Sequence, residues 1–232
     1  MDRVLRILPA AALIAMTLFG AAGSAAAAPA TCATNPTPGS TISGAFTVNS
    51  GQNCVLAHVT VMGPVTVNGG GSLTLLTASL LRGLTSNSGS GSIVIVNSTV
   101  TGNTGLIGGG GGLLICGSQL NGAVSVGDFG ASSWIGDPGE AVSVGDVAVS
   151  NCTGNQITGS LTLALTNANL EVEGNLITGK NALTMVDFEG EFAGNSVTGA
   201  ATCSALFLRA IDTDHATPNS YTGTNNGCPV TQ

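Results

Sequence analysis

GNQITG at residues 154–159, GNLITG at 174–179 and GNSVTG at 194–199 are nearly identical hexapeptides that recur at a constant interval. More divergent copies begin at positions 39, 58, 78, 97, 117 and 218. The nine copies therefore have a period of about 20 residues, apart from one gap nearly twice as long between the copies at 117 and 154. A repeat of this period predicts a solenoid, in which each repeat packs only against its neighbours.

The pattern inside each repeat predicts strands. The third and fifth residues of the hexapeptide are mostly polar, as in Thr99 and Thr101, and this two-residue alternation is typical of a strand with one buried face. Alternation continues between the copies, in SLTLL from Ser72 and NLEVE from Asn169. We therefore expect two or three short strands and no helix in each repeat. The fourth residue is apolar in every copy: Ile42, Val61, Leu81, Val100, Leu120, Ile157, Ile177, Val197 and Tyr221.

Two other positions of the hexapeptide predict how the repeats stack. The sixth residue is glycine in all nine copies, which indicates a corner where the backbone needs a conformation that side chains resist. The second residue lies on the buried side, so stacking about 4.8 Å apart would place its side chains in an internal hydrogen-bonded ladder. Its members are Ser40, Val59, Ser79, Ser98, Ser118, Asn155, Asn175, Asn195 and Asn219.

The period, the corner glycines and the asparagine ladder resemble the right-handed parallel β-helix superfamily of pectate lyases, polygalacturonases and many bacterial surface proteins. The resemblance covers roughly residues 39–223. It implies an all-β, single-stranded right-handed parallel β-helix of about nine to ten coils of ~20 residues. In the lyases of the superfamily, carboxylates on the outer face hold calcium and an arginine or lysine abstracts a proton. The basic residues Arg82, Lys180 and Arg209 lie on different coils, which argues against lyase activity.

Residues 1–28 have the features of a secretory signal peptide, because Arg3 and Arg6 precede an apolar run and a stretch of small residues. Residues 29–232 are then a β-helix domain with N- and C-terminal caps, secreted and either extracellular or associated with the cell wall. No second apolar run approaches the roughly 20 residues that span a bilayer. The domain has 11 acidic and 3 basic side chains, and this charge disfavours nucleic acid and anionic lipid as partners.

The domain contains six cysteines, an even number that predicts disulfides in an oxidising compartment. In sequence order, the first pair and the last pair are each spaced by close to one coil, which brings Cα atoms near the usual disulfide separation. The middle pair is spaced by nearly two coils, and a bond there would require the intervening segment to loop out. CxxC spacing is absent, so metal or redox chemistry at the cysteines is not expected. The cysteines are Cys32, Cys54, Cys116, Cys152, Cys203 and Cys228.

The region between the copies at 117 and 154 departs from the period, and AVSVGD occurs there twice, at Ala123 and Ala141. Two organisations are open: a degenerate coil, which the repeated motif favours, and a looped excursion around ASSWIGDPGE. Trp134 lies in this region. The favoured interpretation is that its side chain fills a widened core, and the alternative is a platform on which a sugar ring stacks.

Acidic side chains cluster near the C-terminal repeats. Glu171 and Glu191 each lie three residues before a hexapeptide, so they should stack, with Glu173, Asp187 and Glu189 beside them. Asp212, Asp214 and His215 occupy roughly the next coil. Three interpretations are open: a solvated face, a calcium site, or a hydrolase in which Glu171 and Glu191 act about 5 Å apart with assistance from His215. Calcium is the only cofactor that the sequence suggests, and no catalytic residue is assigned.

A threonine array of the kind that binds ice is interrupted, because Met62, Arg82, Gln119 and Leu176 occupy equivalent positions of the hexapeptide.

Taken together, these features predict a non-catalytic extracellular structural or ligand-binding module. Its predicted partner is an extracellular polysaccharide or a cell-wall component. The alternative is a polysaccharide-active enzyme, hydrolase or lyase-like, that uses the acidic outer face.

Overall fold

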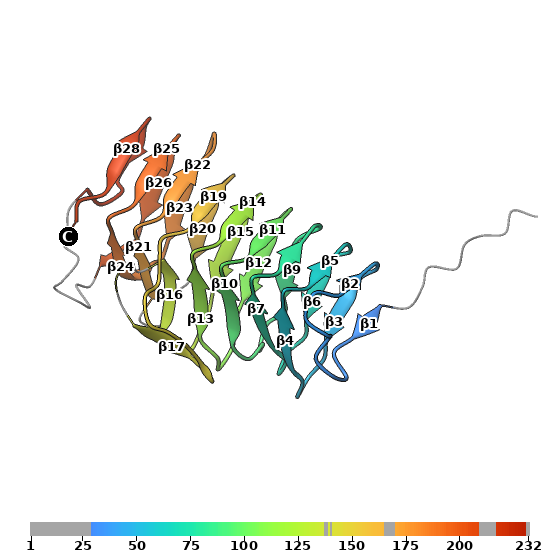
Figure 1. The fold of residues 1–232 in the computed structure, drawn as a ribbon. Coiled ribbons are helices and arrows are strands. Elements are labelled where there is room, and N and C mark those ends of the chain that lie inside the picture. The colour runs from blue at the N-terminus through green and yellow to red at the C-terminus, as the bar shows by residue number, and fades with distance from the viewer. Residues whose placement is uncertain (1–28, 137–138, 140, 165–169, 209–216, 231–232) are drawn as a thin grey trace, which may run out of the picture.

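The computed structural model describes residues 29–136, 139, 141–164, 170–208 and 217–230. The chain forms an all-β parallel solenoid of about nine coils of ~20 residues, and the described residues contain no helix (Figure 1). Each complete coil contributes one strand to each of three parallel sheets, which we call sheets A, B and C. Along the chain, the strands of a coil belong to sheets B, A and C in that order. The predicted signal peptide, residues 1–28, lies outside the described residues.

Sheet A has ten strands: β1 (Ala30–Thr31), β3 (Phe46–Val48), β6 (Val65–Val67), β9 (Leu84–Ser86), β12 (Thr104–Ile107), β15 (Val124–Gly127), β20 (Leu161–Ala164), β23 (Leu183–Val186), β26 (Ala201–Ser204) and β29 (Asn225–Asn226). Sheet B has nine: β2 (Thr41–Ile42), β5 (Thr60–Val61), β8 (Ser79–Leu80), β11 (Thr99–Thr101), β14 (Gln119–Asn121), β19 (Gln156–Thr158), β22 (Leu176–Thr178), β25 (Ser196–Thr198) and β28 (Ser220–Thr222). Sheet C has eight: β4 (Asn53–Ala57), β7 (Ser72–Leu76), β10 (Ile93–Val96), β13 (Leu113–Cys116), β16 (Ser133–Gly136), β21 (Leu170–Glu173), β24 (Glu189–Ala193) and β27 (Phe207–Leu208).

The hexapeptide forms the sheet B strand of each coil, and its fourth residue points into the core as predicted, except in the copy at 78. There Leu80 pairs with Val61 and Val100, so Leu80 is buried and Leu81 is 44% exposed. The copy has one extra residue before its corner glycine, Gly83. Its ladder position is consequently Ala78 rather than Ser79, and the assignment made from the sequence was wrong by one residue.

Neighbouring coils approach closely at every corner glycine except Gly44, where a Cβ atom would meet nothing within 4 Å. A Cβ atom at Gly179 would collide with the carbonyl oxygen of Gly159 in the preceding coil, although the φ of Gly179 is outside the left-handed range. The same collision recurs at Gly199, whose Cβ would meet the carbonyl oxygen of Gly179. The predicted conformation that side chains resist is confirmed at six of the nine corners, which have a positive φ: Gly83, Gly102, Gly122, Gly159, Gly199 and Gly223. At Gly179 it does not apply, and close stacking alone provides the reason for glycine.

The internal ladder is confirmed. The Asn175 amide oxygen accepts hydrogen bonds from the backbone N–H and the Nδ2 of Asn155, both at 2.9 Å. The Nδ2 of Asn175 donates to the carbonyl oxygen of Ile135 at 2.7 Å and to Asn195 Oδ1 at 3.0 Å. Side-chain hydrogen bonds of this kind join six of the nine predicted members, each to the next, so buried polar groups find partners in the adjacent coil. These members are Ser98, Ser118, Asn155, Asn175, Asn195 and Asn219.

The cysteines form three disulfides between sequence neighbours, as the prediction of disulfides in an oxidising compartment requires. The bonds are Cys32–Cys54, Cys116–Cys152 and Cys203–Cys228, with Cα atoms 5.9, 5.4 and 4.9 Å apart. Three disulfides are consistent with an extracellular protein.

The irregular region is an excursion from the coil. Strand β14 pairs directly with β19, with Leu120 opposite Ile157, so the coil at 154 stacks on the coil at 117. The favoured degenerate coil is therefore wrong. The looped alternative also needs correction, because β16 within ASSWIGDPGE is a regular strand of sheet C. The chain leaves the coil after β16, and Cys152 ties its return to Cys116.

The excursion folds as an antiparallel hairpin of β17 (Val142–Val144) and β18 (Val147–Val149). Its two-residue turn begins with Gly145 at a φ of 58°, and glycine is favoured there in a tight hairpin. Alternate valines give the hairpin one apolar face, which packs on the outward side of sheet C in a second apolar cluster (Figure 1). We call this the outer cluster: Val94, Val96, Leu114, Cys116, Val142, Val144 and Cys152, with Leu76, Trp134, Val147 and Val149 packed against them.

Replacing Gly179 with alanine should destabilise the fold by about 3 kcal/mol, because the new methyl group must displace backbone of the adjacent coil. Gly105→Ala is the matched control, since a Cβ there meets nothing within 4 Å. We expect Gly105→Ala to change the free energy of unfolding by less than about 0.5 kcal/mol. Denaturant unfolding of both variants measures the difference, and equal stabilities would contradict the stacking explanation.

Asn175→Ala should cost about 3 kcal/mol or more, because it leaves buried polar groups of Asn155 and Ile135 without a partner. The control is Asn87→Ala, which removes an exposed hydrogen bond of 2.9 Å to Asn68 that water can replace. This variant should lower the free energy of unfolding by only about 0.5 kcal/mol. Thermal melting of the two variants compares them, and a mild effect of Asn175→Ala would mean that the ladder is dispensable.

Candidate functional site

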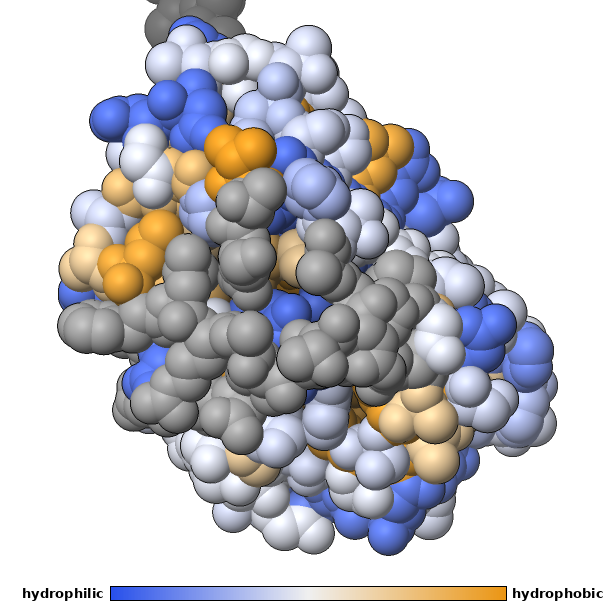
Figure 2. All heavy atoms as spheres, turned by 90° about the vertical axis from the view of Figure 1, so that its left-hand side faces the viewer, coloured by the Kyte–Doolittle hydropathy of each residue, from blue (hydrophilic) through white to orange (hydrophobic). Residues whose placement is uncertain are grey.

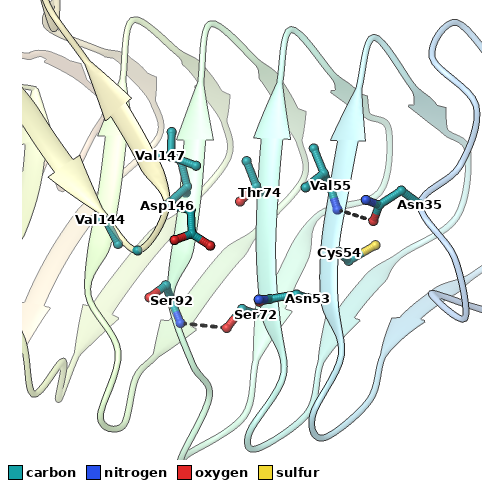
Figure 3. Close-up of a pocket in the computed structure, with 12 residues that line it drawn as sticks. Asn35, Asn53, Cys54, Val55, Ser72, Thr74, Ser92, Val144, Asp146 and Val147 are labelled. Carbon is teal, nitrogen blue, oxygen red and sulfur yellow. Dashed lines mark hydrogen bonds between the residues drawn. The ribbon is translucent and has the colours of Figure 1, made fainter.

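The hairpin overhangs sheet C and creates two clefts, one on each side of its tip. The first, cleft I, has a volume of about 340 Å³ and lies between the hairpin and the N-terminal coils (Figure 3). Its polar lining residues are Asn35, Asn53, Ser72, Thr74, Ser92 and Asp146, and its other lining residues are Cys54, Val55, Val94, Val144, Gly145 and Val147.

The floor of cleft I is built from outward-facing residues of successive sheet C strands. Val55, Thr74 and Val94 are aligned in the parallel register of β4, β7 and β10. The Ser92 N–H donates a hydrogen bond to Ser72 Oγ at 3.1 Å, which holds that hydroxyl at the edge of the cleft (Figure 3). The floor therefore presents apolar and hydroxyl groups side by side on a rigid sheet.

The walls of cleft I come from two segments outside the sheet. On one side, Asn35 Oδ1 accepts a hydrogen bond of 2.9 Å from the Val55 N–H, which leaves the Asn35 amide nitrogen as a possible donor to a ligand. On the other side, exposed Asp146 extends from the hairpin turn on the cleft side (Figure 3). Among the described residues that line this cleft, Asp146 carries the only ionisable side chain.

The second cleft, cleft II, has a volume of about 330 Å³ and lies on the other side of the hairpin tip. It is lined by small residues and by one large aromatic residue, Trp134. The lining residues are Ser92, Gly110, Gly111, Gly112, Ala131, Ser132, Trp134, Ser143, Val144 and Gly145. Ser92, Val144 and Gly145 line both clefts, so the hairpin tip forms a shared wall.

Trp134 does not fill the central core, contrary to the favoured interpretation of the sequence. Its neighbour Ile135 points into the core, and alternation along β16 directs Trp134 to the outer side of sheet C. There it packs against the outer cluster and stays partly exposed where it lines cleft II. The signal for the hairpin was present in AVSVGDVAVS, where alternating valines flank a Gly-Asp turn.

The structure aligns two of the predicted acidic residues, because Glu171 and Glu191 are register partners on β21 and β24. Glu173 is instead opposite Ala193. Glu173 and Glu191 are only 3% and 2% exposed, so the interpretation of a solvated face is wrong for both. Neither buried carboxylate is isolated, because each of the glutamates at positions 171, 173, 189 and 191 has an interaction partner. Asp187 is exposed, and Glu189 is half-buried.

Within the described part of the chain, no three His, Cys, Asp or Glu side chains form a group that could hold a metal ion. The proposed neighbours Asp212, Asp214 and His215 lie outside the described residues. The calcium site at Glu171, Glu173, Asp187, Glu189 and Glu191 therefore stays a prediction.

Threonine recurs most often at one outward position on sheet A, a face that the hexapeptide does not reach. The outward residue of each strand is threonine in seven of the ten registers, and Gly105, Ser125 and Asn226 occupy the others. This is a single row, and stacked β-branched residues stabilise a sheet without any ligand. The threonines are Thr31, Thr47, Thr66, Thr85, Thr162, Thr184 and Thr202.

On the face drawn in Figure 2, the described residues form no comparable feature. That view shows the C-terminal end of the solenoid, where the coloured apolar residues lie in separate small groups between polar ones. Isolated apolar residues are normal on a protein surface. In the described ranges, no helix has the length and apolar character to cross a membrane.

The calcium prediction can be tested by thermal melting. Carboxylates on adjacent strands repel by on the order of 1 kcal/mol in water, and a divalent cation would relieve this repulsion. Millimolar CaCl₂ should raise the melting temperature, and Glu171→Gln combined with Glu191→Gln should remove the increase. The control Asp146→Asn, outside the acidic group, should keep it. An unchanged melting temperature in the wild type, with no calorimetric binding, would exclude the site.

Comparison of the chain with known protein families, with curated proteins and with solved structures found no match in any of the three. The function is therefore inferred from the geometry of cleft I, cleft II and the acidic residues of β21 and β24.

Proposed function

We propose that the chain is exported and acts outside the cell as a non-catalytic ligand-binding module. The signal-peptide features of residues 1–28 and the three disulfides support export. A solenoid cross-linked by disulfides provides a rigid scaffold. Such a scaffold holds binding groups in fixed positions, so little conformational entropy is lost when a ligand binds.

Cleft I is the observation that carries the proposal. It is a concave site of about 340 Å³ whose floor belongs to the rigid sheet and whose roof is the hairpin. Its hydroxyl and amide groups alternate with valines, and such a surface suits a ligand that has both hydroxyl groups and C–H faces. An uncharged polyhydroxylated ligand, from an extracellular polysaccharide or a cell-wall component, fits this chemistry. Asp146 would accept hydrogen bonds from ligand hydroxyls.

The chemistry of cleft I supports binding rather than catalysis. Glycoside hydrolysis by the usual route needs two carboxyl groups that flank the scissile bond. Asp146 is the only ionisable side chain among the described lining residues, so that pair is not provided there. A ligand held in cleft I would therefore be bound without being cleaved.

The second candidate is a polysaccharide-active enzyme of the right-handed pectate-lyase-like superfamily that acts at the acidic residues. The alignment of Glu171 with Glu191 favours it, because neighbouring strands bring carboxyl groups near the separation of retaining glycosidases. Burial opposes it, because both carboxyls must contact the sugar and Glu191 is only 2% exposed.

Isothermal titration of the mature chain with neutral and acidic glycans, alongside a reducing-end assay, tests the proposal. Thr74→Val and Asp146→Ala should each weaken binding of a neutral glycan about tenfold, the effect of one lost hydrogen bond. Thr162→Val is the matched control, because Thr162 faces outward on sheet A. It should leave binding unchanged.

Two outcomes would overturn the proposal. One is the absence of binding to every glycan tested. The other is release of reducing ends that Glu171→Gln abolishes while Asp146→Ala does not, which would identify the chain as the enzyme of the second candidate.

A further inference from the structure

We infer that cleft II is a second sugar subsite, in which Trp134 is the stacking platform and the hairpin tip separates it from cleft I. The ligand would then be an oligosaccharide or polysaccharide chain long enough to contact both clefts, rather than a single sugar. This inference rests on the proposed function and specifies the ligand of the same site.

Trp134 has the position that a stacking platform needs. It projects from the outer side of sheet C, and neighbours on both sides hold β16 in parallel register. Part of the indole packs against the outer cluster, which fixes its orientation, while the side chain remains partly exposed in cleft II. A fixed aromatic ring next to a cavity loses little entropy when a flat ligand stacks on it.

The remainder of cleft II suits a pyranose ring. Three consecutive glycines, Gly110, Gly111 and Gly112, line the cleft without side chains, and Gly110 is exposed with open space around it. The serines at positions 92, 132 and 143 supply hydroxyl groups that can donate and accept hydrogen bonds. The described lining residues of cleft II include no ionisable side chain. The site therefore combines an apolar platform with neutral polar groups, which matches the C–H face and the hydroxyls of a neutral sugar.

The two clefts are arranged as adjacent subsites. A Cβ atom on Gly145 would lie 3.7 Å from Ser92 Oγ, so the hairpin tip sits close to the sheet between the clefts. One sugar ring can occupy only one side of the tip. A chain that straddles the tip can place a ring in each cleft, and the second contact then forms at high effective concentration. Affinity should consequently rise with chain length.

The chain contains a single tryptophan, so intrinsic fluorescence reports directly on cleft II. The experiment titrates the mature protein with cello-oligosaccharides and chito-oligosaccharides of one to six units, by fluorescence and by calorimetry in parallel. For the series that binds, we expect the hexamer to bind at least tenfold more tightly than the monomer. The hexamer should also change the tryptophan emission and protect Trp134 from acrylamide quenching.

Variants at two positions separate cleft II from cleft I. Gly110→Val should block cleft II while leaving Trp134 in place, because a Cβ at Gly110 meets nothing within 4 Å and its φ is not left-handed. It should reduce the affinity for the hexamer about tenfold and leave the affinity for the shortest ligand unchanged. Trp134→Phe should retain most of the affinity for the hexamer. Trp134→Ala should reduce that affinity to the same extent as Gly110→Val does. Gly105→Ala on sheet A is the matched control and should bind as the wild type does.

The outcomes distinguish this inference from the proposed function. Suppose that saccharides bind in a manner that depends on Asp146, but that the affinity does not change with chain length or in Gly110→Val and Trp134→Ala, and that the wild-type tryptophan emission does not respond. Cleft II is then not a subsite, and the proposed function stands. If no glycan binds at all, the proposed function fails. If indole or another aromatic probe changes the emission while every saccharide leaves it unchanged, cleft II takes aromatic ligands and the inference is overturned.

Discussion

Backbone hydrogen bonding between successive coils is the interaction on which the rest of this structure depends. It sets the spacing between equivalent residues at one strand separation, about 4.8 Å, along the whole solenoid. Each position of the repeat therefore has its own counterpart directly above and below it. Amide side chains at such a position can bond to one another, as Asn155, Asn175 and Asn195 do. The corner at Gly179 has no room for a side chain, which explains why this residue must be glycine.

The same constraint concentrates functional variation outside the coil. Inward positions are committed to the core or to the ladder, so chemistry that contacts a ligand must come from outward residues and from insertions. The hairpin of β17 and β18 is such an insertion, and it turns a nearly flat sheet into two clefts. It also gives sheet C a second apolar layer, so Val94 and Leu114 are buried although they face away from the central core.

Features that recur from coil to coil could be predicted from the sequence, and features that occur only once could not. Period, buried positions, ladder and disulfides could be predicted because each depends on contacts with the adjacent coil, and those contacts recur from coil to coil. The predicted register was wrong by one residue at Leu81. Two adjacent leucines both fit a core position, so the sequence does not show on which side of them the extra residue lies. Trp134 and the hairpin were misjudged because the outer cluster joins segments that no periodicity relates. Burial of Glu173 and Glu191 was likewise not predicted from the two-residue alternation.

The position of the hairpin has a consequence for how this scaffold can change. The chain departs from sheet C at the end of one coil and returns at the sheet B strand that begins the next coil, and the disulfide Cys116–Cys152 holds Cα atoms 5.4 Å apart beside this excursion. The length of the excursion is thus independent of the solenoid period, and residues can be gained or lost there without shifting any later coil. Because loop-closure entropy grows only slowly with length, such changes cost little stability. The walls of both clefts can therefore diversify while the coil beneath them stays constant, as variable loops do on a conserved framework.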